Sequence, residues 1–287
     1  MIKVVDIFAG PGGLSEGFAS VTDARGHPAF DIVLSVEKEA SAYETLLLRA
    51  FYRCFATAPD KYYLYLRGEI DADTLYKSNP AEAEAAAEQC WHATLGPGGE
   101  SPATVRERIN DAVGDETDWV LIGGPPCQAY SIAGRSRNNG KLHYDPTKDE
   151  RQRLYVEYLQ ILAEHRPAVF IMENVKGLLS ATLANERMFH RILEDLRNPA
   201  IAVRREGRHG RWIRSGGYSI YSLTEHRMFE NGDLQGSVIH AERYGIPQAR
   251  HRVILLGIRD DISGVTPKTL ARQSPRSSPR IPRCWRQ

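Results

Sequence analysis

KVVDIFAGPGG, residues 3–13, contains the strongest fold signal in the chain. Residues 3–8 form a short apolar run that predicts a buried strand, and residues 14–22 show helical spacing after the glycine-rich turn. Glycine lets a ligand approach the backbone closely, and the N-terminus of a helix favours anionic groups. The segment therefore predicts a strand–turn–helix unit that binds a nucleotide-like ligand, although an ordinary strand–helix turn would look similar.

Short apolar runs and longer amphipathic stretches alternate along the rest of the chain. Strands separated by helices predict an α/β fold with a doubly wound, mostly parallel sheet. We expect one domain over residues 1–260, with a mostly helical insertion at about 41–117, and a disordered basic tail rich in Pro, Ser and Arg over 261–287. The further strands are expected at residues 31–37, 119–122, 168–172, 218–223 and 252–258.

Composition excludes several classes of protein. The chain has 287 residues, 42% of them hydrophobic and 25% charged, and a formal net charge of +1. Nucleic-acid affinity would therefore have to come from local basic patches rather than from a basic chain. The four cysteines form no CxxC pair, so we expect no metal site and a reducing, cytoplasmic location. We also expect no membrane partner, since no apolar run is long enough to span a bilayer.

Glu37 closes the second predicted strand and is a candidate ligand-binding acid. In nucleotide-binding half-folds, an acid at this place hydrogen-bonds the ribose hydroxyls. The glycines of residues 10–13 do not follow the GxGxxG spacing, which counts against NAD and a dehydrogenase.

GGPPCQAYS, residues 123–131, follows another predicted strand end, where open α/β sheets bind their ligands. The two prolines stiffen this loop and restrict where Cys127 can point. A cysteine in a rigid polar loop is typical of a nucleophile, because the thiolate is available near neutral pH. The alternative is a buried, inert cysteine.

Two further segments carry charged side chains close to predicted strands. Glu173, in ENV (173–175), could act as an acid or hydrogen-bond donor at a pocket edge, or could merely complement a helix dipole. Arg250 and Arg252, in YGIPQARHR (244–252), share one face of an extended chain. Such arginines can clamp a phosphate or a base edge, or can form an edge-strand charge pair.

In this order, the segments DIFAGPGG, GGPPCQAYS, ENVKGLL and QARHR resemble the DNA (cytosine-5)-methyltransferase family. The resemblance implies the S-adenosylmethionine-dependent methyltransferase (Rossmann-like) fold and methyl transfer from S-adenosylmethionine to C5 of a flipped-out cytosine in double-stranded DNA. It also implies a bacterial restriction–modification role. The implied cofactor-binding residues are Phe8, Gly10, Gly12, Gly13, Glu37, Glu69 and Pro125, with Glu69 standing in Gly-Glu-Ile where the family usually has Gly-Asp-Ile.

The same resemblance assigns the chemistry and the DNA contacts. Cys127 would attack cytosine C6, Glu173 would donate a hydrogen bond to N3, and Arg250 would reach O2. The implied DNA-binding residues are Gln128, Ser131, Arg135 and Arg252, and no metal takes part.

Two alternatives remain open at this point. A tRNA cytosine-5 methyltransferase would carry the same motifs, and a non-catalytic or truncated subunit would keep them as well. Family members normally continue past QARHR into a target-recognition region, which the composition of residues 261–287 does not resemble. We therefore expect this region to be absent, and the chain to methylate poorly alone or to need a second polypeptide that carries it.

Overall fold

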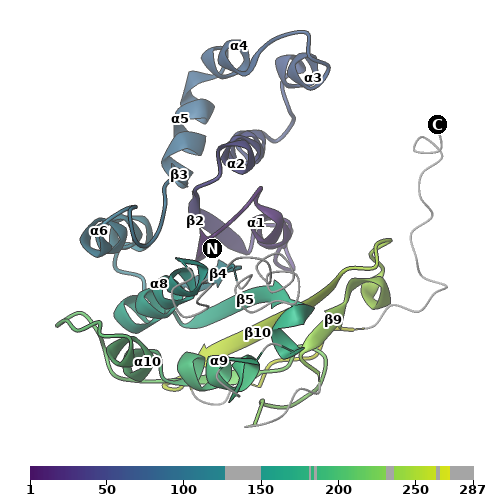
Figure 1. Ribbon diagram of the computed structural model, residues 1–287. Coiled ribbons are helices and arrows are strands. Elements are labelled where there is room, and N and C mark those ends of the chain that lie inside the picture. The colour runs from purple at the N-terminus through teal and green to yellow at the C-terminus, as the bar shows by residue number, and fades with distance from the viewer. Residues whose placement is uncertain (127–149, 181, 184–185, 231–235, 263–265, 272–287) are drawn as a thin grey trace, which may run out of the picture.

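The computed structural model describes the chain except for residues 127–149, 181, 184–185, 231–235, 263–265 and 272–287. In the described part, one eight-stranded sheet runs through the molecule in the order β3-β2-β1-β4-β5-β10-β8, with β9 paired to β10 (Figure 1). The strands are β1 (Ile2–Ile7), β2 (Phe30–Glu37), β3 (Cys90–His92), β4 (Val120–Gly123), β5 (Val169–Val175), β8 (Tyr218–Tyr221), β9 (Val238–His240) and β10 (His251–Arg259). A separate hairpin pairs β6 (Thr182–Leu183) with β7 (Glu186–Arg187).

The direction of the strands confirms a mostly parallel sheet. The five strands from β3 to β5 run parallel to their neighbours. β10 runs antiparallel to β5, β8 and β9, so it enters the sheet from the opposite end. As a result, the beginning of β10 lies beside the end of β5.

Helices cover both faces of the sheet, which confirms the doubly wound arrangement. Alternate side chains of β1 point to opposite faces: Val4 packs toward α1 (Gly13–Ala19), and Val5 joins the larger core on the other side. The helices of that larger core are α6 (Pro102–Val113), α8 (Glu150–His165), α9 (Met188–Arg197) and α10 (Pro199–Arg205). The short turns η2 (Lys176–Ser180) and η3 (Ala241–Tyr244) follow β5 and β9.

The expected insertion is mostly helical, but its end belongs to the sheet. It contains α2 (Ala40–Arg53), α3 (Asp60–Leu66), α4 (Ala72–Lys77) and α5 (Pro80–Gln89), which extend to the top of Figure 1. These helices pack around a small core of their own that includes Leu46, Phe51 and Leu75. The chain then returns as β3, which pairs with β2 at the sheet edge and which the sequence analysis missed because only three residues form it. The domain boundaries stay predictions.

Candidate functional site

The turn after β1 depends on unusual backbone conformations. Phe8 has a φ of 56°, which is uncommon for a residue other than glycine, and Gly12 at the N-cap of α1 has a φ of 85°. A Cβ at Gly12 would also lie 2.9 Å from Cδ1 of Leu46 in α2. The glycine therefore serves both the turn and the packing of α2, and the turn holds the Phe8 ring at the end of the sheet.

Glu37, the last residue of β2, is tied to this turn. Its Oε2 accepts a hydrogen bond from the Gly10 N–H at 2.7 Å. Its Oε1 accepts hydrogen bonds from the N–H groups of Lys38 at 2.9 Å and Glu39 at 2.8 Å. Because the side chain is buried, these bonds hold the carboxylate in one position between β1 and β2.

A first cavity of about 200 Å³, here called the β2 cavity, lies beside Glu37. It brings together Phe8 and Glu37, which were predicted as site residues in separate segments, and the GGPP loop of residues 123–126. Residues that the sequence analysis had not named also line it, from the chain after β3 and from α8. The complete lining is Phe8, Val36, Glu37, Lys38, Ala93, Leu95, Gly124, Pro126 and Leu154.

Glu69 does not belong to this cavity. It follows α3, is exposed, and forms an ion pair with Arg67. The family segment that Glu69 was matched to follows the third strand of the sheet, but that strand is β3, and the residues after it at the cavity are Ala93 and Leu95. The helices α4 and α5 and strand β3 lie between the Gly-Glu-Ile sequence and the position at which it was expected.

A second cavity of about 540 Å³, the β5 cavity, contains Glu173. Oε1 of Glu173 lies 2.7 Å from Nε of Arg252 and 3.5 Å from Nη2 of Arg250. Antiparallel pairing of β10 with β5 sets Ile254 opposite Glu173, which brings the beginning of β10 to the carboxylate. The full lining is Phe8, Ala9, Pro11, Gly13, Leu14, Arg49, Gly124, Glu173, Ile239, Ala241, Gln248, Arg250, Arg252 and Ile254.

The two cavities meet at Phe8 and Gly124, which line both. A Cβ at Gly124 would lie 3.2 Å from Oε2 of Glu173, so the glycine lets the loop approach this carboxylate closely. Cys127, Gln128, Ser131 and Arg135 lie outside the described residues. The described part of the loop ends at Pro126, on the wall of the β2 cavity.

Asn174 is a positioning residue that the sequence analysis quoted without a role. Its Nδ2 donates a hydrogen bond to the carbonyl of Pro125 at 3.1 Å, and its Oδ1 accepts one from the N–H of Val175 at 2.9 Å. The side chain is buried, so these bonds connect the end of β5 to the GGPP loop. The sequence signal that could have identified Asn174 was its position in ENV, next to the candidate acid Glu173.

Asp6 is a buried acid under the same end of the sheet. Burial raises the pKa of its carboxyl from 3.8 to about 7, although a hydrogen bond from the Ser15 hydroxyl opposes this shift. The negative charge of Glu37 also raises the pKa, and the Arg53 guanidinium lowers it. Asp6 thus connects β1 to α1 and responds to the charge of Glu37.

Comparison with known proteins finds relatives of this chain among bacterial type II methyltransferases. The chain is 29% identical over 277 residues to the type II methyltransferase M.Bpa9945I of Bacillus paralicheniformis, covering 91% of this chain and 54% of that protein. It is 26% identical to the type II methyltransferase M.AgeI of Thalassovita gelatinovora, covering 90% of this chain and 40% of the relative. The chain therefore spans about half the length of the curated relatives that it matches.

Among solved structures, the Entamoeba histolytica methyltransferase EhMeth aligns with a TM-score of 0.48 and 13% identity, over 96% of this chain and 58% of that one. Within the described residues, no helix combines the length and the apolar character that crossing a membrane requires. The family model for C-5 cytosine-specific DNA methylases matches residues 103–199 and 225–284, which make up more than half of the chain. This chain belongs to the C-5 cytosine-specific DNA methylase family.

Proposed function

We propose that this chain binds S-adenosylmethionine and a flipped-out cytosine of double-stranded DNA, and methylates the base at C5. The observation that carries the proposal is the junction of the two cavities at Phe8 and Gly124. A methyl donor and its acceptor must bind side by side, with their reacting atoms close together. Two adjoining cavities, one beside Glu37 and the other beside Glu173, meet that requirement.

The β2 cavity offers a hydrogen-bond acceptor and an aromatic surface that an adenosine-containing cofactor can use. An ionised carboxylate offers about four acceptor positions. The three backbone N–H groups on Glu37 leave capacity for a ribose hydroxyl. The Phe8 ring provides an aromatic surface beside this carboxylate. When bound, S-adenosylmethionine supplies an electrophilic methyl group on a sulfonium centre.

The residues of the β5 cavity suit a cytosine ring. Glu173, when it carries a proton, donates a hydrogen bond to N3, and a guanidinium donates to O2, so both offset the negative charge that builds on the ring. We assign the O2 contact to Arg250, because it is the more exposed of the two arginines and lies farther from Glu173. Arg252, at 2.7 Å, then holds the Glu173 carboxyl in place.

Cys127 is the proposed nucleophile, on the basis of the family resemblance. Its thiolate adds to C6 and forms a carbon–sulfur bond, which makes C5 nucleophilic. C5 would then take the methyl group as its bond to the sulfonium sulfur breaks, leaving S-adenosylhomocysteine. A proton acceptor would remove the C5 proton, the ring electrons would re-form the C5–C6 double bond, and Cys127 would leave as the thiolate. The target cytosine must leave the duplex before Cys127 can attack it, at a cost of a few kcal/mol.

Cofactor binding tests the first half of the proposal without requiring turnover. Calorimetric titration of the purified 287-residue chain should show a clear preference for S-adenosylmethionine over NAD. Equal or tighter binding of NAD would contradict the assignment of the β2 cavity.

Covalent trapping tests the second half. DNA containing 5-fluorocytosine should form a stable adduct with the chain in the presence of S-adenosylmethionine, and Cys127→Ser should abolish the adduct. Adduct formation by the serine variant would exclude Cys127 as the nucleophile.

Unlabelled tRNA that competes better than unlabelled DNA would favour the tRNA substrate. A chain that turns over only after a second polypeptide is added would be one part of a two-chain enzyme.

We further propose that the substrate is modified as part of a restriction–modification system, since the two relatives described above are named type II methyltransferases. The measurement is cleavage of genomic DNA from cells that express the chain. Protection against a restriction enzyme of matching target sequence is expected only when a second polypeptide that carries the target-recognition region is expressed with the chain.

A further inference from the structure

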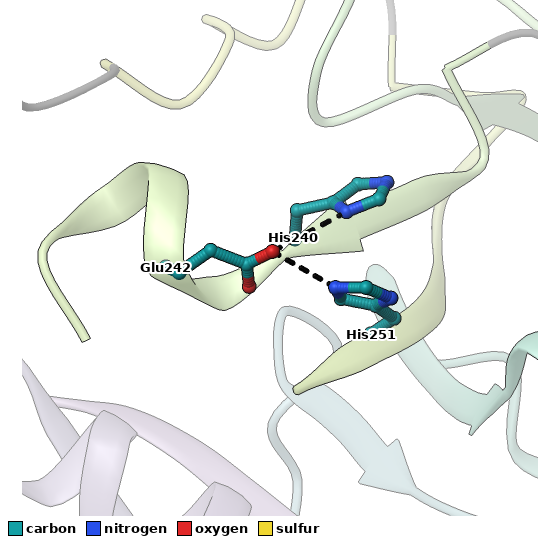
Figure 2. Close-up of side chains that lie close together, drawn as sticks. All are labelled: His240, Glu242 and His251. Atoms are coloured by element: carbon teal, nitrogen blue, oxygen red, sulfur yellow. Dashed lines mark hydrogen bonds and ion pairs between the residues drawn. The ribbon is translucent and has the colours of Figure 1, made fainter. Parts of the chain in front are cut away.

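Outside the two cavities, three potential metal ligands converge where β9, η3 and β10 meet. His240 ends β9, Glu242 lies in η3, and His251 begins β10. Figure 2 shows the Glu242 carboxylate extending from the turn toward both imidazole rings. One oxygen, Oε1, lies 2.8 Å from Nε2 of His251 and 3.6 Å from Nδ1 of His240. The three ligand atoms all lie within 4.8 Å of one another.

These distances suit a single divalent ion. Zinc binds imidazole nitrogen and carboxylate oxygen at about 2.0–2.2 Å, so neighbouring ligand atoms of a tetrahedral site are about 3.4 Å apart. The two separations from Glu242 Oε1 lie on either side of that value. Small side-chain rotations would therefore bring the two imidazoles and the carboxylate into the positions of three zinc ligands. A water molecule could take the fourth position.

The surroundings allow an ion to enter. The side chains of His240, Glu242 and His251 are 31%, 39% and 28% exposed, respectively, so solvent reaches all three. The backbone already holds them together, because His240 and His251 are directly paired across the β9–β10 ladder. Their ring centroids are 4.2 Å apart. Little ordering entropy remains to be lost on binding.

The histidine pair lies on the reverse side of the wall of the β5 cavity. The next pair along the ladder, Ile239 and Arg252, lines that cavity. Because successive residues of a strand point to opposite faces, His240 and His251 face away from it. Arg250 and Arg252 direct their guanidinium groups toward Glu173, so their positive charges lie on the cavity side.

We propose that His240, Glu242 and His251 bind one zinc-class divalent ion, which cross-links β9, η3 and β10 behind the wall that carries Arg252. Two imidazoles and a carboxylate favour zinc and neighbouring transition metals over magnesium or calcium, which prefer oxygen ligands. The site is separate from the methyl-transfer chemistry, and its effect is to stabilise the β9–β10 ribbon.

The test is titration of the full 287-residue chain with Zn²⁺ alone, followed by calorimetry and thermal unfolding. We expect one ion per chain and a higher melting temperature. His251→Ala and Glu242→Gln should each weaken Zn²⁺ binding at least tenfold. His27→Ala is the matched control, because His27 also faces a carboxylate, Asp23 at 3.6 Å, and the described structure shows no second histidine beside this pair. It should bind Zn²⁺ like the unchanged chain.

Cobalt distinguishes this site from the cysteines. Co²⁺ bound by imidazole and carboxylate lacks the thiolate charge-transfer absorption that a cysteine ligand produces. That absorption, or equal Zn²⁺ affinity in the unchanged chain and both ligand variants, would overturn the proposal. Far-UV circular dichroism checks folding. If His251→Ala fails to fold, His240→Ala replaces it, because His240 lies at the end of a short strand paired only with β10 in the described sheet.

Discussion

Glu37 and Glu173 are two glutamates near the ends of parallel strands, and each lines one of the two adjoining cavities. Backbone N–H groups hold Glu37, and two of the three come from the next two residues. Guanidinium groups from a distant segment hold Glu173. The first arrangement is rigid because it uses the main chain. The second can rearrange when a ligand arrives, because it uses long side chains.

This contrast matches the two proposed roles. A cofactor site that binds the same molecule in every turnover gains from a preorganised acceptor. Glu173 must contact a cytosine that enters from DNA, so partners that can move allow its side chain to adjust. The predictions below test this difference, beginning with the largest expected effect.

Glu173→Gln should slow adduct formation with 5-fluorocytosine DNA by about 100-fold or more, which is the usual loss when a general acid is removed. Glutamine keeps the shape of the side chain but cannot give a proton to N3. Binding of S-adenosylmethionine, measured by calorimetry, should stay within about twofold of the unchanged chain. The exposed Glu84→Gln in α5 serves as control. An equal loss of cofactor affinity would move Glu173 to the cofactor site.

Asp6→Asn should change how stability depends on pH. The pKa of Asp6 is about 7 in the folded chain and 3.8 when unfolded, so the folded state retains its proton to higher pH. This group's contribution to the free energy of unfolding therefore falls as pH rises from about 4 to about 7, and then levels off. Between pH 5 and pH 8, the asparagine variant should gain roughly 2 kcal/mol relative to the unchanged chain.

Urea unfolding at several pH values measures this gain. The exposed Asp23→Asn is the control, and it should show no comparable gain. Parallel pH profiles for Asp6→Asn and the unchanged chain would show that Asp6 ionises normally in the folded protein.

Glu37→Gln should weaken S-adenosylmethionine binding about tenfold. The new amide NH₂ would face a backbone N–H, and leaving such a buried donor unpaired costs about 1–3 kcal/mol. Calorimetry gives the affinity and urea unfolding gives the stability. Glu39→Gln is the matched control, because this exposed neighbour caps α2 by accepting from the Ala42 N–H, which an amide oxygen can also do. Undiminished affinity in Glu37→Gln would exclude the ribose contact.

The two arginines should differ slightly in what they contribute to stability. Arg252 lies 2.7 Å from Glu173 and is 28% exposed, whereas Arg250 lies at 3.5 Å and is 52% exposed. Arg252→Ala should lower the free energy of unfolding by about 1 kcal/mol, and Arg250→Ala by less than about 0.5 kcal/mol. The reverse order in urea unfolding would show that Arg250 is the residue that holds Glu173.

Local sequence signals predicted much of the sheet and part of the site. Apolar runs marked six of its strands, and the glycine turn and the acid at the end of β2 appeared as adjacent features of one βαβ unit. The sequence analysis did not predict the short strands β3 and β9 or the reversed direction of β10. Three to nine residues contain little information about which strand they pair with and in which direction they run. Glu69 stays a prediction, and the structure places it between α3 and α4, apart from the chain that follows β3.

The sequence by itself determined the family, the α/β class and the residue types at each strand end. These depend on local periodicity and on motifs read along the chain. Only the tertiary structure decided that Arg250 and Arg252 meet Glu173, that Asn174 holds the carbonyl of Pro125, and that His240 faces His251. Each of these contacts joins segments whose distance in space depends on strand order and register, which are set by packing of the whole sheet.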